Sequence, residues 1–217
     1  MTANDLQQPL GLLLYAHPDD LDSHTVRLVL AEKAIPYTLI LVDPDDYPED
    51  LASLNPYNTL PTLIDRQLKL YQPTVILEYL EDRYRQPRLY SDNPIQRAEQ
   101  RQYLWRIQHD WLSLAQILLR HPDSFDVEQA NQARKQLQDS LISLSPLFGM
   151  QQWFMQDQFG ICDCVLAPIL WRLPTLEIHL PPALCAPLLA YCQRIFQRPA
   201  FVASLTARER QARRPIL

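Results

Sequence analysis

Two cysteines close together in the chain could in principle form a redox or metal-binding pair. Cys162 and Cys164 are separated by one residue. However, positions i and i+2 of a helix point to different faces, and no second pair follows at the spacing of a zinc site. The surrounding pattern is apolar and helical, which favours packing in the core. We therefore predict no metal site and four reduced, buried cysteines, at positions 162, 164, 185 and 192.

Hydroxyl and imidazole groups gather around the first turn of the chain. Tyr15 and Ser23 could supply a hydroxyl for catalysis, and His17 and His24 could serve as a base or a ligand. Tyr15 belongs to an apolar run, and Ser23 is better explained as a helix cap. No nucleophile or metal partner is defined beside either histidine. Structural or surface roles are therefore favoured for all four residues.

The glycine content excludes several classes of enzyme. The chain contains three glycines, at positions 11, 149 and 160, and 19 prolines. The dinucleotide-binding loop, the phosphate loop and the G-x-S-x-G turn of hydrolases all need closely spaced glycines. None of these motifs can be built from this sequence.

Bulk composition is that of an ordinary globular protein of 217 residues, with 47% apolar and 21% charged residues. The net charge of −5 argues against bulk attraction to nucleic acid or anionic lipid. The first nine residues carry no basic signal-peptide pattern, and no apolar run is long enough to span a membrane. We expect a cytoplasmic protein that does not bind membranes.

The first part of the chain alternates strands and helices. In chain order we expect strand 11–16, helix 23–34, strand 37–42, a short helix within 43–55, strands 59–65 and 67–71, and a helix from 72 to about 84. Asp22 or Ser23 would cap the first helix, whose apolar stripe leaves Arg27 and Lys33 on other faces. This order predicts a small four-stranded mixed sheet with helices on its faces.

The second part is helical throughout. Residues 85–94 contain two prolines and no periodicity, which is typical of a linker. Long apolar stripes then predict helices over 95–119, 127–147, 162–173, 184–196 and 201–214. We expect one domain over 10–85, a linker over 86–94, a helical domain over 95–210, and flexible tails at 1–9 and 211–217.

Three segments together resemble the glutathione S-transferase fold. They are SHTVRLVLAEKAIPY, NPYNTLPTLID and FGICDCVLAPILW. The resemblance implies a fold of class α/β plus all-α, with a thioredoxin-like N-terminal domain and a helical C-terminal domain. It also implies that Pro61 follows a cis peptide bond, so that the backbone of Leu60 faces a peptide-like ligand. In the segment Gly160–Asp163, the carboxylate would reach back to the capping amide of the buried helix.

Within that fold the chain is more similar to the stringent starvation protein A family, the branch that associates with RNA polymerase. The similarity is carried by DLDSHTVRLVLAEKA, LPTLIDRQLKLYQPTVILEYLEDRY, YLWRIQHDW, DCVLAPILWRLP and FVASLTARER. The RLP and SLTxxER segments matter most, because they are not general features of transferases. The resemblance implies a homodimer without cofactor or catalytic residue. It would bind RNA polymerase holoenzyme through the primary sigma factor and alter promoter use in starvation, stationary phase or stress.

The positions that would bind and activate glutathione argue against an enzyme. The resemblance places Asp20 where the family has its catalytic hydroxyl or thiol, and an ionised carboxylate neither donates a hydrogen bond nor favours a thiolate. Gln72 and Pro73 replace an acid and a hydroxyl that would hold the charged end of glutathione. The vestigial site thus comprises Asp20, Leu60, Pro61, Gln72 and Pro73. The alternative is a glutathione S-transferase or glutathione-binding sensor with weak residual activity.

The resemblance places a partner-binding surface at the domain junction. The family has Pro-His-Pro there, and only Pro87 matches it, with Arg85 and Gln86 in place of the other two residues. A solvated linker is the alternative. Arginine, tyrosine and proline suit an interface, and the arginines suit an acidic surface of the sigma factor. The expected surface comprises Tyr84, Arg85, Gln86, Pro87, Arg88, Leu89 and Tyr90.

The C-terminal segment TARERQARRPIL holds four arginines and one acid, Glu209. It could touch DNA or an acidic partner, but a run of this kind is more often a solvated helix face or a frayed end. No helix-turn-helix or zinc-finger pattern is present, and we expect no independent sequence-specific DNA binding.

Overall fold

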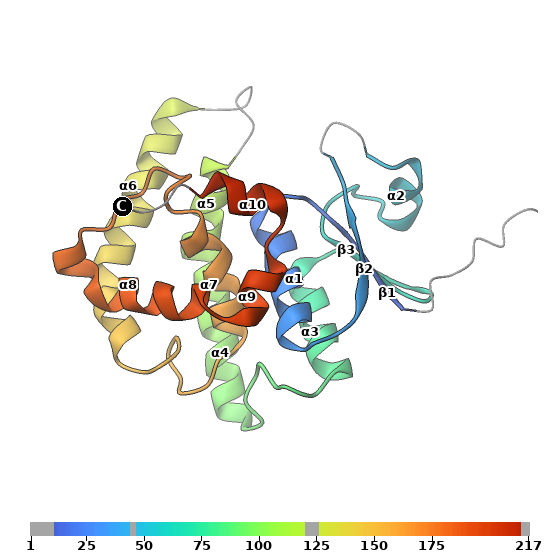
Figure 1. The fold of residues 1–217 in the computed structure, drawn as a ribbon, viewed down its shortest axis with the longest axis horizontal. Coiled ribbons are helices and arrows are strands. Elements are labelled where there is room, and N and C mark those ends of the chain that lie inside the picture. Colours follow the sequence, from blue (N-terminus) through green and yellow to red (C-terminus); the bar gives the residue numbers. More distant parts are fainter. Residues whose placement is uncertain (1–10, 44–46, 120–125, 214–217) are drawn as a thin grey trace, which may run out of the picture.

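A computed structural model describes residues 11–43, 47–119 and 126–213. The first part of the chain forms a four-stranded sheet with three helices, as expected (Figure 1). Its elements are β1 (Leu12–Ala16), α1 (Leu21–Glu32), β2 (Tyr37–Leu41), α2 (Glu49–Leu54), β3 (Thr62–Asp65), β4 (Leu68–Leu70) and α3 (Pro73–Arg83).

The sheet has the order β2-β1-β3-β4. β2 runs parallel to β1, whereas β3 is antiparallel to β1 and β4 is antiparallel to β3. α1 and α3 lie between the sheet and the helical part, and α2 lies on the opposite side of the sheet (Figure 1). β1 is apolar throughout because both of its faces are covered: Leu14 packs into the main core, and Tyr15 packs into a smaller cluster with Leu51 of α2.

The second part of the described chain is helical. Its elements are α4 (Pro94–Arg106), a π-helical turn η1 (Ile107–Leu112), α5 (Ser113–Leu118), α6 (Val127–Leu144), a 3-10 turn η3 (Ser145–Gly149), α7 (Ile161–Trp171), α8 (Pro182–Phe196), α9 (Pro199–Ser204) and α10 (Ala207–Ala212). The long helix expected over 95–119 is therefore interrupted by one π-helical turn. Sequence periodicity does not show this, because apolar residues recur at helical spacing of three and four straight through the turn, at positions 104, 107, 111, 114 and 118.

One hydrophobic core runs through both parts. It joins Leu14 of β1, Val26 of α1 and Leu80 of α3 to the buried helix α7. Ten of the eleven residues of α7 are buried, which explains why its sequence is apolar on every face. The sheet and the helical part therefore pack as one body, and a change at their contact affects both.

Several local expectations were wrong. Asp20, not Asp22 or Ser23, caps α1, and the helix begins at Leu21. Arg27 and Lys33 lie outside the apolar stripe of α1 as expected, but both are buried, Arg27 against Glu209 of α10 and Lys33 against Glu81 of α3. The single helix expected over 201–214 is two helices, since Leu205 and Thr206 are extended between α9 and α10.

The ends of the chain were expected to be flexible. α10 continues to Ala212, which is two residues into the expected C-terminal tail. Residues 1–10 and 214–217 lie outside the described residues. Within the described part, no helix has the length and apolar character needed to cross a bilayer.

Candidate functional site

The topology gathers the expected glutathione-site residues at one edge of the sheet. β1 and β3 are antiparallel, and Tyr15 near the end of β1 pairs with Thr62 at the start of β3. Leu60 and Pro61, which precede Thr62, therefore lie beside the turn that leads from β1 to Asp20. Leu63 pairs with Leu70, so the end of β4 leads Gln72 to the same edge. The peptide bond between Leu60 and Pro61 is cis, as expected.

Asp20 is occupied as a helix cap. Its carboxylate accepts hydrogen bonds from the backbone N–H and, at 3.0 Å, from the hydroxyl of Ser23. Burial raises the pKa of Asp20, while the hydrogen bonds from Ser23 lower it. Ser23 Oγ in turn accepts the N–H of His17 at 3.0 Å. The hydroxyl is thus engaged within the turn, and Asp20 offers only acceptor atoms.

The head of α3 is likewise closed by its own residues. Gln72 Oε1 accepts the N–H of Val75 at 2.8 Å and caps the helix. Pro73 occupies the first helical position, where its missing N–H removes one donor that a carboxylate ligand would use. The next hydroxyl, Thr74 Oγ1, accepts from Gln108 of η1 at 3.1 Å. The head of this helix is therefore built for folding and offers no acidic partner to an ammonium group.

The segment Tyr84–Tyr90 is held by a buried ion pair. Lys33 Nζ lies 2.7 Å from Glu81 Oε2. Lys33 also donates to the carbonyl oxygens of Tyr84 and Pro87, both at 2.8 Å. The Glu81 carboxylate accepts the N–H groups of Leu89 and Tyr90 at 3.1–3.2 Å. One cation and one anion thus fix both ends of the loop, which includes a second cis peptide bond, between Gln86 and Pro87.

The two ends of this segment have different environments. Arg85, Gln86, Pro87 and Arg88 are exposed, whereas Leu89 and Tyr90 are buried. Arg88 forms an ion pair with Asp92, and Arg83, just before the segment, pairs with Asp65 at 3.0 Å. Among the described residues no ion pair involves Arg85. The surface available to a partner is therefore the tip, 85–88, and the buried pair 89–90 anchors it.

Gly160 allows the segment to dock on the buried helix. The N–H of Ile161 donates to Leu89 O at 3.0 Å, and a Cβ at position 160 would lie 2.9 Å from the same oxygen. Asp163 accepts the Gly160 N–H at 2.8 Å, which confirms the expected capping contact. A side chain at position 160 would therefore collide with the backbone of the loop, and glycine avoids this.

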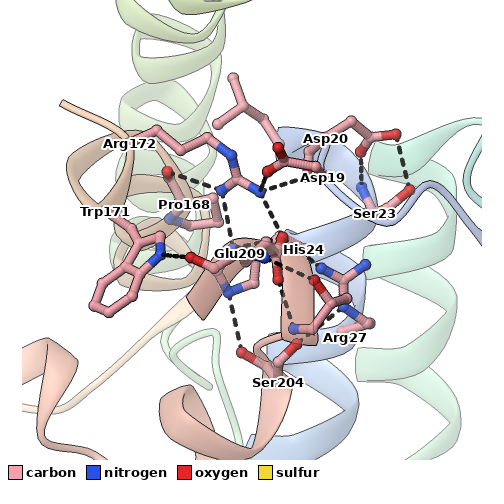
Figure 2. Close-up of polar contacts among 12 residues, drawn as sticks. Asp19, Asp20, Ser23, His24, Arg27, Pro168, Trp171, Arg172, Ser204 and Glu209 are labelled. Atoms are coloured by element: carbon pink, nitrogen blue, oxygen red, sulfur yellow. Dashed lines mark hydrogen bonds and ion pairs between the residues drawn. The ribbon is translucent and has the colours of Figure 1, made fainter. Parts of the chain in front are cut away.

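A buried polar cluster ties the turn after β1 to the end of the chain (Figure 2). Glu209 accepts from Arg27 Nη2 at 2.6 Å and from Arg172 Nη2 at 2.5 Å, and all three side chains are buried. The segments RLP and SLTxxER therefore meet in space, because Arg172 comes from the first of them and Glu209 from the second. The turn itself is fixed through its carbonyl oxygens, which accept as follows: His17 O from Arg27, Pro18 O from Thr206, and Asp20 O from Arg172.

His24 is neutral at the centre of this cluster. Arg172 Nη1 donates to Nδ1 at 3.0 Å, so that nitrogen carries no proton, and Nε2 donates to Ser204 Oγ at 3.1 Å. Burial and the charges of Arg172 and Arg27 hold the pKa of His24 well below its usual range. The 3.4 Å separation from Glu209 is therefore not an ion pair. His24 has a structural role.

The C-terminal arginine run is only partly a solvated face. Arg208 and Arg210 are exposed, but Glu209 is buried and closes a capping box with Thr206. Arg213 lies over the rings of Trp171 and Phe196, 3.9 and 4.3 Å from their centroids. The expectation of a frayed end was wrong for residues 207–212, because Glu209 anchors α10 in the core.

The four cysteines are free thiols in the core. Burial raises the pKa of Cys192 to about 12 and raises the pKa of Cys162 and Cys164 as well. These groups remain protonated and are poor nucleophiles or ligands. Over the described residues, no three His, Cys, Asp or Glu side chains are grouped so that they would hold a metal ion.

Comparison with known proteins agrees with this architecture. Residues 14–88 match the family model "Glutathione S-transferase, N-terminal domain", and residues 111–199 match "Glutathione S-transferase, C-terminal domain". A stringent starvation protein A homolog of Coxiella burnetii is 41% identical over 202 residues, which covers 93% of this chain and 95% of the relative. The chain belongs to the stringent starvation protein A family.

Similarity to transferases is weaker in sequence and strong in fold. The glutathione S-transferase GstB of Escherichia coli is 25% identical over 204 residues, covering 87% of this chain and 95% of the enzyme. The bacterial glutathione transferase BphK, solved as a ternary complex, superposes with a TM-score of 0.79 at 23% identity and covers 89% of this chain and 97% of its own. The expected fold class is confirmed.

The structure also assigns roles to residues that sequence reasoning missed. Lys33 and Glu81 position the loop, and Arg27, Arg172 and Glu209 form the buried cluster. The only signal for the cluster was that RLP and SLTxxER distinguish this family. Nothing in a single sequence indicates that two segments more than 30 residues apart share one carboxylate.

Proposed function

We propose that this protein is a transcription regulator that binds RNA polymerase holoenzyme through its primary sigma factor, without catalysing a reaction. It would act in the cytoplasm and alter promoter use in starvation, stationary phase or stress. The proposal rests on the family to which the chain belongs and on the resemblance from which these partners follow. One observation carries it: hydrogen bonds from the buried Lys33 and to the buried Glu81 fix the backbone of the loop 84–90, while the tip of the loop, residues 85–88, is exposed.

A rigid, exposed tip is suited to binding another protein. Its conformation is set before binding, so less conformational entropy is lost on association. Arg85 makes the tip basic, which suits an acidic face of the sigma factor. Since Arg88 already pairs with Asp92, Arg85 is the cation to which we assign the main contact.

The test is a pull-down of holoenzyme with the purified protein. Replacing Arg85, Gln86 and Arg88 by alanine should abolish retention without changing the melting temperature, because all three side chains are exposed. Lys135→Ala, an exposed cation on α6, is the matched control. Full retention by the triple variant would refute the assignment of the loop. Failure of the unaltered protein to retain holoenzyme would refute the function.

A glutathione S-transferase or glutathione-binding sensor is the second candidate. The cis bond before Pro61 and the similarity to GstB favour it. The engaged side chains of Asp20 and Gln72 argue against it. Retention on glutathione-agarose together with turnover of an aryl halide would favour this candidate over the first.

We further propose that the protein is a homodimer. α3 and α4 lie together, joined by the pair Glu78–Arg101, and they expose large apolar side chains. Val75 is 49% exposed and Trp105 is 56% exposed. Covering such side chains is a common reason for association. Size-exclusion chromatography should give a dimer, and Trp105→Glu should shift it toward the monomer.

A further inference from the structure

Two cavities lie side by side along α4, next to the loop. The first has a volume of about 660 Å³ and lies between residues 88–92, α4 and residues 151–159. The second, of about 380 Å³, lies between α4, η1 and α6. Tyr103 and Met155 line both cavities, so the two cavities are adjacent.

The first cavity is lined with amides. A free glutamine amide offers donors and an acceptor, the groups that an extended peptide backbone needs. Three of these amides are already engaged. Gln96 Oε1 accepts the hydroxyl of Ser91 at 2.7 Å and Gln100 Oε1 accepts its N–H at 2.8 Å, while Gln100 Nε2 donates to Gln156 Oε1 and Gln156 Nε2 donates to Asp163. Gln151 and Gln158 are exposed and are the amides available to a ligand. The glutamines of the lining are Gln96, Gln100, Gln151, Gln156 and Gln158.

The charge of the first cavity is negative. Asp92, Glu99 and Asp157 line it together with a single cation, Arg88. Arg88 is neutralised by Asp92. Neither Glu99 nor Asp157 forms an ion pair among the described residues, and both are exposed. The cavity is therefore complementary to a lysine or arginine side chain.

The second cavity is mainly aromatic and aliphatic. Trp111, Phe154 and Leu144 form its walls, and Trp111 Nε1 donates to Ser140 Oγ at 2.8 Å, which leaves the ring face toward apolar neighbours. The π-helical turn η1 supplies Ile107 and Trp111 to this wall. Such turns occur frequently at functional sites. A pocket of this size and lining suits one apolar side chain that anchors a partner.

We infer that the two cavities receive one linear segment of the partner protein, with an apolar anchor in the α4–α6 cavity and a lysine or arginine in the amide-lined cavity. This inference rests on the proposed function, because the partner is the holoenzyme that the adjacent loop binds. It adds a second contact of opposite charge. The basic loop tip would bind acidic groups of the partner, whereas the acidic cavity would bind a lysine or arginine of the partner. A partner must therefore present both signs in the right order, which gives specificity.

Photo-crosslinking tests the inference on the full chain. p-Benzoylphenylalanine is placed at Gln158 for the first cavity, at Arg106 for the second, and at exposed Val202 of α9 as a control. After irradiation with holoenzyme, mass spectrometry should find both cavity positions joined to one short segment of a polymerase or sigma subunit that contains an apolar residue and a lysine or arginine. The control should give no product.

The outcomes separate the two proposals. Crosslinks from the loop position Arg85 without any from 158 and 106 would leave the proposed function standing and overturn this inference. So would crosslinks to a second copy of this chain, or to segments lacking a basic residue. Absence of holoenzyme binding altogether would overturn both.

Charge reversal provides an independent measurement. Glu99→Lys combined with Asp157→Lys should weaken holoenzyme binding about tenfold, because the cationic side chain would meet two like charges. Glu128→Lys combined with Asp139→Lys makes the same change of net charge on the exposed face of α6 and should leave the Kd nearly unchanged. Equal effects of the two double variants would overturn the inference.

Discussion

Lys33 Nζ and Glu81 Oε2 lie 2.7 Å apart with both side chains buried, and this pair supports the loop that we assign to partner binding. Lys33 comes from the end of α1 and Glu81 from α3, so the loop is fixed by the two helices that lie between the sheet and the helical part. The loop therefore keeps its shape as long as the fold does. Substitutions of the buried pair would change both the loop and the stability of the fold, so partner binding must be tested with substitutions in the exposed tip.

Removing the cation should destabilise the whole protein. Lys33→Met leaves the buried Glu81 carboxylate without its partner, and we expect the free energy of unfolding to fall by about 3–5 kcal/mol in urea titrations. Arg106→Met makes a similar change in the exposed pair with Asp110 and should cost less than about 1 kcal/mol. Similar losses in both variants would mean that Lys33 is not a structural ion-pair partner.

A methyl group at position 160 should disturb the contact between the loop and α7. Gly160→Ala places a Cβ against the side-chain amide of Gln156, which can move, and 2.9 Å from Leu89 O, where the backbone must shift, and we expect a loss of about 1–3 kcal/mol in stability. At Gly11 an added Cβ meets nothing within 4 Å, and Gly11→Ala is the matched control. Thermal unfolding of both variants measures the difference. A neutral Gly160→Ala would show that Leu89 does not approach this closely.

The helices and strands could be predicted from the sequence because their signals are local. The stripe that includes Val26 and Leu30 marks α1, and the apolar run of α7 marks a helix buried on all sides. The same reasoning left Arg27 and Lys33 on other faces of α1 and gave them no partner. That was incomplete, because the groups that neutralise them, Glu209 and Glu81, lie far away in the sequence.

The candidate site could be predicted only in part from the sequence. The cis bond before Pro61 and the contact of Asp163 with the capping amide followed from family resemblance and are confirmed. The burial of Leu89 and Tyr90 was missed, because a segment without periodicity reads as solvated linker whichever side chains it buries. The assignment of the loop tip to a partner stays a prediction.

Restoring the acid and the hydroxyl at the head of α3 should restore affinity for glutathione but not catalysis. Gln72→Glu combined with Pro73→Ser supplies a charge partner for the ammonium and a donor for the carboxylate. Each charge-assisted contact is worth about 1.5–3 kcal/mol, so calorimetry should show binding at least about tenfold tighter. Turnover of an aryl halide should stay absent, because Asp20 still offers no donor. Pro73→Ser alone is the control and should gain less. Turnover by the double variant would contradict this account of Asp20.

Neutralising Glu209 should release the C-terminal helix. Glu209→Gln removes the anion that Arg27 and Arg172 share, which leaves the buried Arg172 only the partly exposed Asp19 at 3.2 Å, and we expect a loss of about 3–5 kcal/mol together with faster amide exchange in α10. Glu177→Gln removes the partner of Arg134 at a site where the carboxylate is 73% exposed, and it should change stability by less than about 1 kcal/mol. Unchanged exchange in α10 would show that the cluster does not hold the end of the chain.

Stability should depend on pH through Asp22. Burial, together with the charge of Asp20, raises the pKa of Asp22 to about 7, from 3.8 in a model compound, although a hydrogen bond from Gln116 lowers it. The folded state therefore binds one more proton than the unfolded state between these two values. This contribution to stability is present at low pH and is lost as the pH rises through 7.

The matching experiment compares Asp22→Asn with the unaltered protein in urea titrations at pH 5, 6, 7 and 8. His24 makes a contribution of opposite sign, because its pKa is lowered, but it is present in both proteins and cancels in their difference. The pKa of Asp20 is raised as well, and because its charge acts on Asp22, the difference reports Asp22 together with this interaction. We expect the variant to gain about 2 kcal/mol relative to the unaltered protein between pH 5 and 8, since one proton per molecule corresponds to about 1.4 kcal/mol per pH unit. Asp139→Asn, at an exposed position of α6, should show no such trend. A difference independent of pH would mean that Asp22 titrates near its ordinary pKa in the folded protein.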